Sequence, residues 1–452
     1  MRETKNRIFN KILLTIYLAG AINPRALFFD GTPYCNHVRQ RLQKAIQGGY
    51  VKEYSYTERY GTHLRDQTYL ALTAKGIRYL STCTDFPWLQ YIPGNIKRVA
   101  VFDSPLSASS VAYQVRCGNS INFVVNTGAD LTDFVLTGVP SPLPERSLLS
   151  SAPGESDDYI EDENLDKGKR EKEDPIYGAQ ESGTADSPLA KLSDIRKETA
   201  ARLQAAGLPL PLKQNNGMTF YPAKEVRAIL DQYDELHGQT TAFTYIRYTG
   251  IFVTQDKTWL IYHAKHGGMT WIEKFENNDI RVLKKFDKMC SPKSTLLADE
   301  AYGMLLVYNE KNFGDIINNK FGLRKQGTVI AGRFTKFHFV PLSKTGAYLA
   351  NWLVTYKAKE RQEYIASRAY DLCGAVPNNG RYWQGFRLKA GDTYIFDGAE
   401  MEAGQIFSAI KHIKLAASSG TPIQFKVFCF RWQEPFYRKI WPDAEYLWLL
   451  EQ

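Results

Sequence analysis

Apolar residues near the start of the chain recur at the spacing of a helix that buries one face. Ile8, Ile12 and Ile16 fall on one stripe, and Gly20 follows the run, so we expect a packed first helix over residues 7–18. A secretory signal peptide would also have a basic start, a short apolar run and small residues, but polar residues interrupt this run. No later segment has the roughly 18 uninterrupted apolar residues of a membrane span. The pattern indicates a soluble cytoplasmic protein.

Two further helices are expected from their start signals. Asn23 precedes Pro24 in "AINPRALFF", and Thr32 precedes Pro33 in "TPYCNHVRQRLQKAIQGGYV". A polar cap followed by proline suits a helix start, because the first N–H groups of a helix have no partner within it. The second of these helices is expected to end at the pair Gly48–Gly49, since glycine readily adopts the positive φ of a C-terminal cap.

The apolar period then changes from that of a helix to that of a strand. "YVKEYSYTE" and "QTYLAL" are predicted strands, and the polar segment "RYGTHLRD" between them is a predicted loop. "TAKGIRYLS" predicts a short closing helix capped by Thr73. Three helices, a hairpin and a last helix make a winged helix-turn-helix domain, which we expect to occupy residues 1–97.

The rest of the chain divides into three expected parts. Residues 98–138 are a small connecting segment, in which "SPLSASSVAYQV" could be a helix capped by Ser104 and "INFVV" and "DFVLTGV" could be strands. Residues 139–190 are rich in Pro, Ser, Gly and acidic residues and have little apolar surface, so we expect an acidic disordered linker there. Residues 191–452 are expected to form a C-terminal mixed α/β domain.

The pattern of that C-terminal part alternates between strands and helices. Amphipathic helices are expected in "SDIRKETAARLQAAG" and "YPAKEVRAILDQYDELH", and "AFTYIRYTGIFVT" with "TWLIYHAK" predicts a hairpin. Strand-then-helix couplets follow in "GMLLVYN" with "FGDIINNK", "KFHFVPLS" with "GAYLANWLVTYK", and "TYIFDG" with "EAGQIFSAIKHIKLA". "IQFKVFCFRW" predicts a last buried strand. The whole chain is therefore an expected α+β multidomain protein, without an internal repeat of fixed period.

Charge is unevenly distributed along the chain. Residues 1–100 hold fifteen Lys and Arg against six Asp and Glu, a formal charge of +9, which equals the net charge of the whole chain. Residues 151–190 hold four basic and twelve acidic residues, a charge of −8. A basic N-terminal domain favours an anionic partner. The six cysteines are scattered without a C-x-x-C pair, which is typical of a reducing compartment and excludes a zinc ribbon.

The helix that follows Thr32 has two distinct faces. Cys35, Val38, Leu42, Ala45 and Ile46 fall on one apolar stripe, and polar and basic residues occupy the opposite face. In helix-turn-helix domains the second helix reads base edges in the major groove, and Asn, Gln, Arg and Lys are the residue types suited to that. The expected DNA contacts are Thr32 with Pro33, Asn36, His37, Arg39, Gln40, Arg41 and Lys44 on the helix, and Arg59, His63 and Arg65 on the wing. The alternative is a solvated helix in a protein–protein adaptor.

A resemblance supports the first of these interpretations. The run "TYLALTAKGIRYLS" after a hairpin, behind "VRQRLQKAIQGGYV", resembles the wing and closing helix of bacterial winged-helix regulators. The larger layout is similar to replication-relaxation-type proteins, which plasmids and integrative elements encode. The resemblance implies double-stranded DNA as partner and a role in transcription regulation, replication or transfer of a mobile element. It leaves dimerisation or a protein partner for the C-terminal domain.

Some C-terminal domains of that layout resemble nuclease folds, which raises the possibility of a nuclease site. A restriction-type nuclease needs an Asp and a nearby Glu/Asp-x-Lys to hold Mg²⁺ and activate water. The nearest candidates are Asp397 with Glu400, followed by Gln424 and Lys426 beyond an intervening helix, and the turn residues Asp256 and Lys257. Gln424 stands where a carboxylate is needed. A divergent Mg²⁺-dependent nuclease is therefore an alternative function.

Other chemistries have less support in the sequence. His263 and His266 are three apart in an expected strand and would point to opposite faces, and no H-x-H pair, P-loop or nucleophile elbow occurs. "FCFRWQEPFYRKIW" combines basic and aromatic residues, as a single-strand-binding platform would, but a buried strand explains it equally well. We expect a DNA-binding protein without catalytic residues, metal site or cofactor.

Overall fold

The fold is that of a computed structural model, which describes most of the chain outside its acidic middle. The described residues are 2–29, 35–60, 63–86, 89, 108–132, 134–137, 143, 205, 217–236, 247–254, 257–264, 273–290, 300–318, 333–378 and 385–449. The expected disordered linker and the helix expected over residues 193–207 lie outside them, apart from Leu143 and Ala205.

The N-terminal part, which we call the head, has the predicted order of elements. They are α1 (Arg2–Ala19), the 3₁₀ turn η1 (Pro24–Ala26), α2 (Asn36–Gln47), β1 (Val51–Tyr60), β2 (His63–Leu72) and α3 (Ala74–Ser81). Ile12 and Ile16 of α1 are fully buried, as the apolar stripe predicts. Gly20 and Gly49 have φ near +70°, and the Thr73 hydroxyl accepts from Gly76 N at 3.1 Å, so the predicted helix ends and cap are confirmed.

The helix expected at "AINPRALFF" is only one 3₁₀ turn. Its predicted cap is present, since the Asn23 side chain accepts from Arg25 N at 2.9 Å. The carbonyls of Ala26 and Phe28, however, accept hydrogen bonds from side chains at the C-terminal end of α4 (Ala108–Val125): Asn122 donates to Ala26 O at 2.8 Å, and Asn126 donates to Phe28 O at 3.3 Å. These acceptors are engaged by another element, so the turn does not continue as a helix.

The hairpin is longer than predicted. Its strands pair from Val51 opposite Leu72 to Tyr60 opposite His63, so most of the expected loop "RYGTHLRD" belongs to the strands. Glu58 lies directly opposite Arg65, and the Thr57 hydroxyl donates to Asp66 at 3.0 Å. Cross-strand pairs of this kind favour a continued ladder.

The central sheet has six strands in the order β3-β4-β5-β6-β7-β8. Their bounds are β3 Asp130–Leu131, β4 Thr219–Pro222, β5 Tyr248–Val253, β6 Thr258–His263, β7 Tyr302–Val307 and β8 Lys336–Pro341. Strands β4, β5 and β6 are antiparallel, β7 and β8 run parallel to β6, and β3 runs parallel to β4. Every residue of β5, β6 and β7 is buried, as in a sheet with both faces covered.

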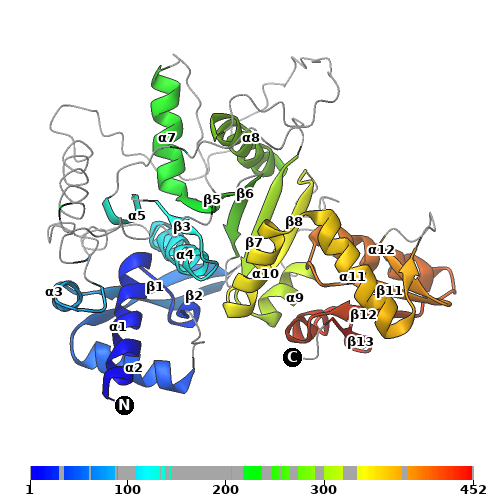
Figure 1. Ribbon diagram of the computed structural model, residues 1–452, viewed down its shortest axis with the longest axis horizontal. Coiled ribbons are helices and arrows are strands. Elements are labelled where there is room, and N and C mark those ends of the chain that lie inside the picture. The colour runs from blue at the N-terminus through cyan, green and yellow to red at the C-terminus, as the bar shows by residue number, and fades with distance from the viewer. Residues whose placement is uncertain are drawn as a thin grey trace.

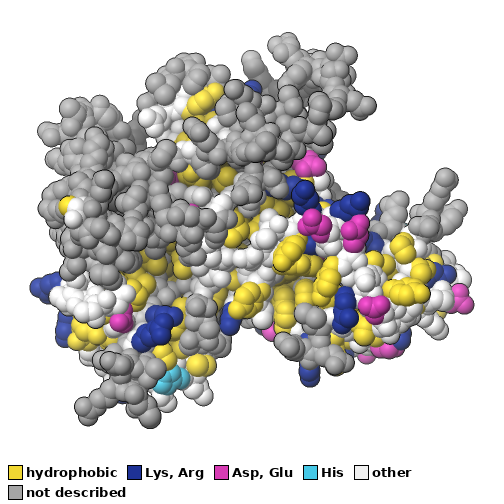
Figure 2. Space-filling view, in the orientation of Figure 1, with side chains coloured by type: hydrophobic (Ala, Val, Ile, Leu, Met, Phe, Trp, Pro, Cys, Tyr) yellow, Lys and Arg dark blue, Asp and Glu magenta, His cyan; other side chains and the backbone are white. Residues whose placement is uncertain are grey.

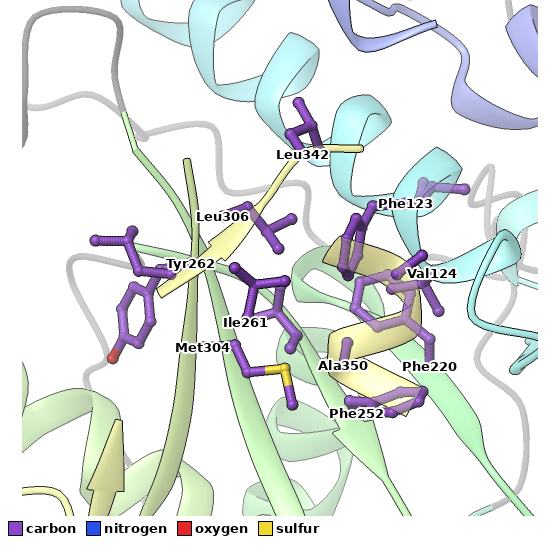
Figure 3. Packing of buried hydrophobic residues seen from close by; sticks show 14 of the residues in the cluster. Phe123, Val124, Phe220, Phe252, Ile261, Tyr262, Met304, Leu306, Leu342 and Ala350 are labelled. Atoms are coloured by element: carbon purple, nitrogen blue, oxygen red, sulfur yellow. The ribbon is translucent and has the colours of Figure 1, made fainter. Parts of the chain in front are cut away.

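Helices cover both faces of this sheet (Figure 1). They are α4 (Ala108–Val125), α7 (Ala223–Leu236), α8 (Glu273–Cys290), α9 (Glu310–Ile317) and α10 (Lys344–Thr355). Figure 3 shows Phe123 of α4 and Ala350 of α10 on the face that bears Ile261, while Tyr262 points to the other side. There the Tyr262 hydroxyl donates to Asp279 of α8 at 3.0 Å.

The connecting segment contributes to this core. The predicted strand "INFVV" is the C-terminal part of α4, and the predicted strand "DFVLTGV" contains the short helix α5 (Phe134–Thr137). Both strand predictions are wrong. A short apolar run does not distinguish a buried helix from a buried strand, and α4 is buried between the head and the sheet.

A second sheet of five strands follows, in the order β13-β12-β11-β10-β9. Its elements are α11 (Ala358–Cys373), β9 (Val376–Pro377), β10 (Leu388–Ala390), β11 (Thr393–Asp397), α12 (Ala403–Ser418), β12 (Phe425–Cys429), η6 (Arg431–Gln433), α13 (Glu434–Tyr437) and β13 (Glu445–Trp448). The three predicted strand–helix couplets and the last buried strand are confirmed. Both sheets have three antiparallel strands followed by two parallel ones, a likeness in topology without a sequence repeat. Among the described helices, none combines the length and apolar character needed to cross a membrane.

Candidate nucleic-acid interface

Helix α2 presents a polar and basic face to solvent. Asn36, His37, Arg39, Gln40 and Lys44 are exposed, as the sequence predicts, and Arg41 is half-buried at the edge. The helix contains no acidic residue. An exposed helix face of this composition offers hydrogen-bond donors and positive charge together, which base edges and phosphates both require. Thr32 and Pro33 lie outside the described residues.

The opposite face fixes the helix to the head. Val38, Leu42 and Ala45 are buried, and Ile46 is partly buried, as predicted. Two predictions for α2 are wrong: Cys35 is exposed, and it forms the N-cap, so the helix begins at Asn36 and not after a cap at Thr32. Cys35 lies before the first helical turn in extended conformation, so the helical periodicity that would have buried it does not apply.

The wing residues lie on the strands of the hairpin. Arg59 is opposite Leu64, and His63 is opposite Tyr60, next to the turn. The prediction that these residues occupy a loop is therefore wrong, because the strand alternation continues through them. Arg65 is exposed. On the face drawn in Figure 2 the head carries more Lys and Arg than Asp and Glu side chains.

A polar cleft of about 660 Å³ lies between the head and α9. Its head-side wall holds Arg39 of α2 and Arg65 of β2, both predicted DNA contacts, and its other wall is the first two turns of α9. The remaining lining residues are Asn23, Pro24, Arg25, Glu53, Asp66, Gln67, Thr68, Asn309, Lys311, Asn312 and Asp315. The exposed face of α2 therefore continues into a cleft that the C-terminal part of the chain helps to form.

One buried side chain connects the two walls of this cleft. Asn119 of α4 accepts from Asn23 N at 2.9 Å on the head side. Its amide nitrogen lies 3.1 Å from the Tyr308 hydroxyl, next to Asn309 of the other wall, and 3.2 Å from His263 Nε2. Asn119 is fully buried. A satisfied buried polar network of this kind holds its members in one arrangement, so the relative position of the walls is fixed.

A second contact holds the hairpin to the same helix. Arg116 of α4 and Glu58 of β1 form an ion pair of 2.7 Å with both side chains largely buried. Removing one partner of such a pair leaves an uncompensated buried charge, which costs several kcal/mol. Together with Asn119, this ion pair fixes the head against the rest of the described chain, the two sheets and their helices between Ala108 and Leu449, which we call the α/β part.

Two cationic residues of the cleft, Lys311 and Arg25, are not among the DNA contacts predicted from the sequence. The local signal for Lys311 is present: Asn309 caps α9 by accepting from Asn312 N at 2.9 Å, which places Lys311 in the first turn. No local pattern shows that this turn faces Arg39. Only the packing of α4 between the head and the sheet brings these residues to one cleft.

The nuclease candidates that the structure describes do not form a metal site. Asp397 and Glu400 are both buried, with 5% and 2% of their surfaces exposed, so neither faces a substrate in solution. Lys426 forms an ion pair of 2.6 Å with Glu445 of β13. Among the described residues, no three His, Cys, Asp or Glu side chains are placed to hold a metal ion together.

Glu400 instead joins the two sheets, through its carboxylate on one side and its backbone carbonyl on the other. Glu400 accepts from Arg361 of α11 at 2.7 Å. The Glu400 backbone carbonyl lies 2.8 Å from Nδ1 of His338 on β8, and burial lowers the pKa of that imidazole. Burial alone would raise the pKa of Glu400, but the nearby His338 and Arg361 outweigh it and lower this pKa. The pattern is that of a structural ionic cluster.

Asp397 makes the stability of this cluster dependent on pH. Burial raises its pKa from 3.8 to about 6, against the opposing effect of Arg387, 3.8 Å away. The folded protein thus retains a proton that the unfolded chain loses. This contribution to stability is fully present below pH 3.8 and is lost as the pH rises through 6.

In the unchanged protein the ionisation of Asp397 lowers the free energy of unfolding between about pH 4 and 6, and Asp397→Asn is expected to abolish this decrease. At pH 8 the variant should therefore be more stable than the unchanged protein by about 1–2 kcal/mol. The upper limit for a two-unit shift is about 3 kcal/mol, and removal of the ion pair with Arg387 reduces it. Urea unfolding of both proteins at pH 5 and pH 8 measures the effect. Destabilisation of the variant at pH 8 would mean that the ionised pair is net stabilising.

The remaining candidates are mostly buried or undescribed. His263 is buried in β6 beside Asn119, and His266 and Asp256 lie outside the described residues. In the segment "FCFRWQEPFYRKIW", Phe428, Phe436, Tyr437 and Trp441 are buried, which supports the core interpretation over a stacking platform.

No protein-family model, curated protein or solved structure matches the chain.

Proposed function

We propose that the protein binds double-stranded DNA through its head, with α2 in the major groove and the hairpin as a wing beside it. The observation that carries this proposal is the exposed face of α2, which joins amides, an imidazole and cations without any carboxylate. The described part of the α/β region does not cover this face. If α2 served to pack on the α/β part of the chain, this face would be buried in the structure.

The biological role follows from the resemblance stated for the head. A regulator of transcription, or an accessory protein of replication or transfer on a bacterial mobile element, would use such a domain to recognise a site. The buried state of Asp397 and Glu400 favours DNA binding without cleavage. Incubation of a supercoiled plasmid with the protein and Mg²⁺ tests the nuclease alternative, which nicking would support.

The test of DNA binding is a salt series with the full chain on a labelled duplex, measured by fluorescence anisotropy. A variant that makes one phosphate contact fewer has a slope of log affinity against log salt that is shallower by about 0.9. Gln40→Ala with Lys44→Ala is expected to weaken binding by roughly tenfold or more, since one bidentate base contact alone contributes about 1–3 kcal/mol and the loss of a phosphate contact weakens binding further. Both side chains are exposed, so the fold is retained.

The matched control is Lys359→Ala with Gln362→Ala, two exposed residues of α11 far from the head in sequence. It removes the same amide and the same charge. Equal affinities of this control and the α2 variant would contradict the placement of α2 on DNA, and we would then search for a protein partner of that face.

A further inference from the structure

The cleft between the head and α9 has the chemistry of a phosphodiester-binding surface. Four of its lining residues are cationic, namely Arg25, Arg39, Arg65 and Lys311. Five others are neutral amides or hydroxyls, and only Pro24 is apolar. Arg, Lys, Asn, Gln and Thr side chains make most protein contacts to the DNA backbone. Among the described residues that line the cleft none is aromatic, so this part of its lining offers no stacking platform for a splayed single strand.

Three of these cations remain available to a ligand. Arg25, Arg39 and Lys311 are exposed, and none of them forms an ion pair within the described part of the chain. The cleft also contains Glu53, Asp66 and Asp315, of which Asp66 accepts from the Thr57 hydroxyl at 3.0 Å. These carboxylates repel a phosphate placed beside them and so restrict the path of a strand to the cationic positions.

Helix α9 is held firmly enough to act as a wall. Phe313 is fully buried against Phe339, with ring centroids 5.2 Å apart. At the other end of the helix, Asn318 donates to Lys439 O at 3.1 Å. Lys311 therefore projects from a fixed turn, and Asn119 fixes that turn relative to Asn23 of the head. A preorganised contact loses little ordering entropy on binding.

We propose that the cleft receives the sugar–phosphate backbone that flanks the base pairs read by α2, with Lys311 as a phosphate contact supplied by the α/β part of the chain. The inference rests on the proposed binding of double-stranded DNA by the head. The DNA interface is then composite, because Arg39 belongs both to the exposed face of α2 and to the cleft. The DNA strand would run from the head-side wall of the cleft to the wall formed by α9. The α/β part is then a component of the DNA site.

The experiment compares Lys311→Ala with Lys359→Ala in the full chain on the same duplex. Both changes remove one exposed lysine from the α/β part, so they alter net charge equally and differ in position. Removal of one phosphate contact makes the log–log salt slope shallower by about 0.9 in Lys311→Ala only. Its affinity deficit relative to the unchanged protein accordingly shrinks about 3.5-fold as salt rises from ~50 to ~200 mM.

The outcomes separate this inference from the proposed function. If Lys311→Ala and Lys359→Ala have equal slopes while the Gln40 and Lys44 double variant loses binding, the composite site is overturned and DNA binding by α2 stands. If the α2 variant also binds as tightly as the unchanged protein, both proposals fail. A selective decrease of the slope in Lys311→Ala supports the composite interface, and Lys311→Arg should then restore the slope, because arginine keeps the positive charge.

Discussion

Gly118→Ala is expected to lower the free energy of unfolding by about 2 kcal/mol or more. A Cβ at this position would lie 1.8 Å from Ala21 O and 2.6 Å from Ala19 O, both backbone atoms at the end of α1. Overpacking of a closed contact costs about 1–3 kcal/mol, and atoms that cannot rotate away place the cost at the upper end. Alanine regains about 1 kcal/mol through its helix propensity, which does not offset the clash.

The matched control for this change is Gly404→Ala in α12. There a Cβ would meet only the Glu402 side chain, with Oε1 at 2.9 Å, and no backbone atom; this side chain caps α12 by accepting from Gly404 N at 3.0 Å. The control is expected to lose at most about 1 kcal/mol, because a shift of Glu402 weakens one cap hydrogen bond while alanine is the better helix former. Denaturant midpoints of both variants measure the difference. If the two variants had equal stability, α4 and α1 would not approach each other as closely as the structure shows.

The contact between Gly118 and the backbone at the end of α1 also explains why some elements could be predicted from the sequence and others could not. The couplets of β8 with α10 and of β11 with α12 were predictable because an apolar strand is followed by a local start signal: Ser343 caps α10 and Glu402 caps α12. "INFVV" has no such signal. Its helical state depends on Gly118 and Asn122 meeting the head, and those contacts join residues about a hundred positions apart.

The candidate site shows the same division. The exposed face of α2 follows from helical periodicity, so His37, Gln40 and Lys44 could be placed from sequence alone. The cleft could not, because its walls come from β1 and β2 of the head and from α9. Burial of Asp397 was equally hidden: a carboxylate after an apolar strand is typical of a catalytic residue and of a structural ion-pair partner alike.

Arg361→Ala is expected to have the largest effect on stability, a decrease of about 3–5 kcal/mol. The guanidinium of Arg361 donates to Glu400 at 2.7 Å, to Leu353 O at 2.8 Å and to Tyr356 O. Its side chain is only 5% exposed, and that of Glu400 only 2%. Truncation would leave the Glu400 carboxylate buried without its cation, and the carbonyls of Leu353 and Tyr356 without their donor.

The pH dependence of this decrease identifies its cause. In the unchanged protein the pKa of Glu400 is lowered, so its contribution is present above its ordinary value of 4.5 and is lost as the pH falls through the folded pKa. Without Arg361 that pKa rises, because burial is then opposed by His338 and Arg387 without the ion pair and hydrogen bond of Arg361, and protonation relieves the buried charge at a higher pH. The deficit of Arg361→Ala should therefore be smaller at pH 5 than at pH 8 in urea unfolding.

A double-mutant cycle completes the argument. Glu400→Gln removes the buried charge, so adding it to Arg361→Ala should restore part of the stability, with an interaction free energy of about 1–3 kcal/mol. Additive effects would mean that Arg361 acts through its bonds to Leu353 and Tyr356 rather than through Glu400. Arg361 lies on α11 and Glu400 follows β11, while His338 approaches Glu400 from β8. A positive interaction would therefore also show that Glu400 contributes to stability through an ionic cluster that joins the two sheets.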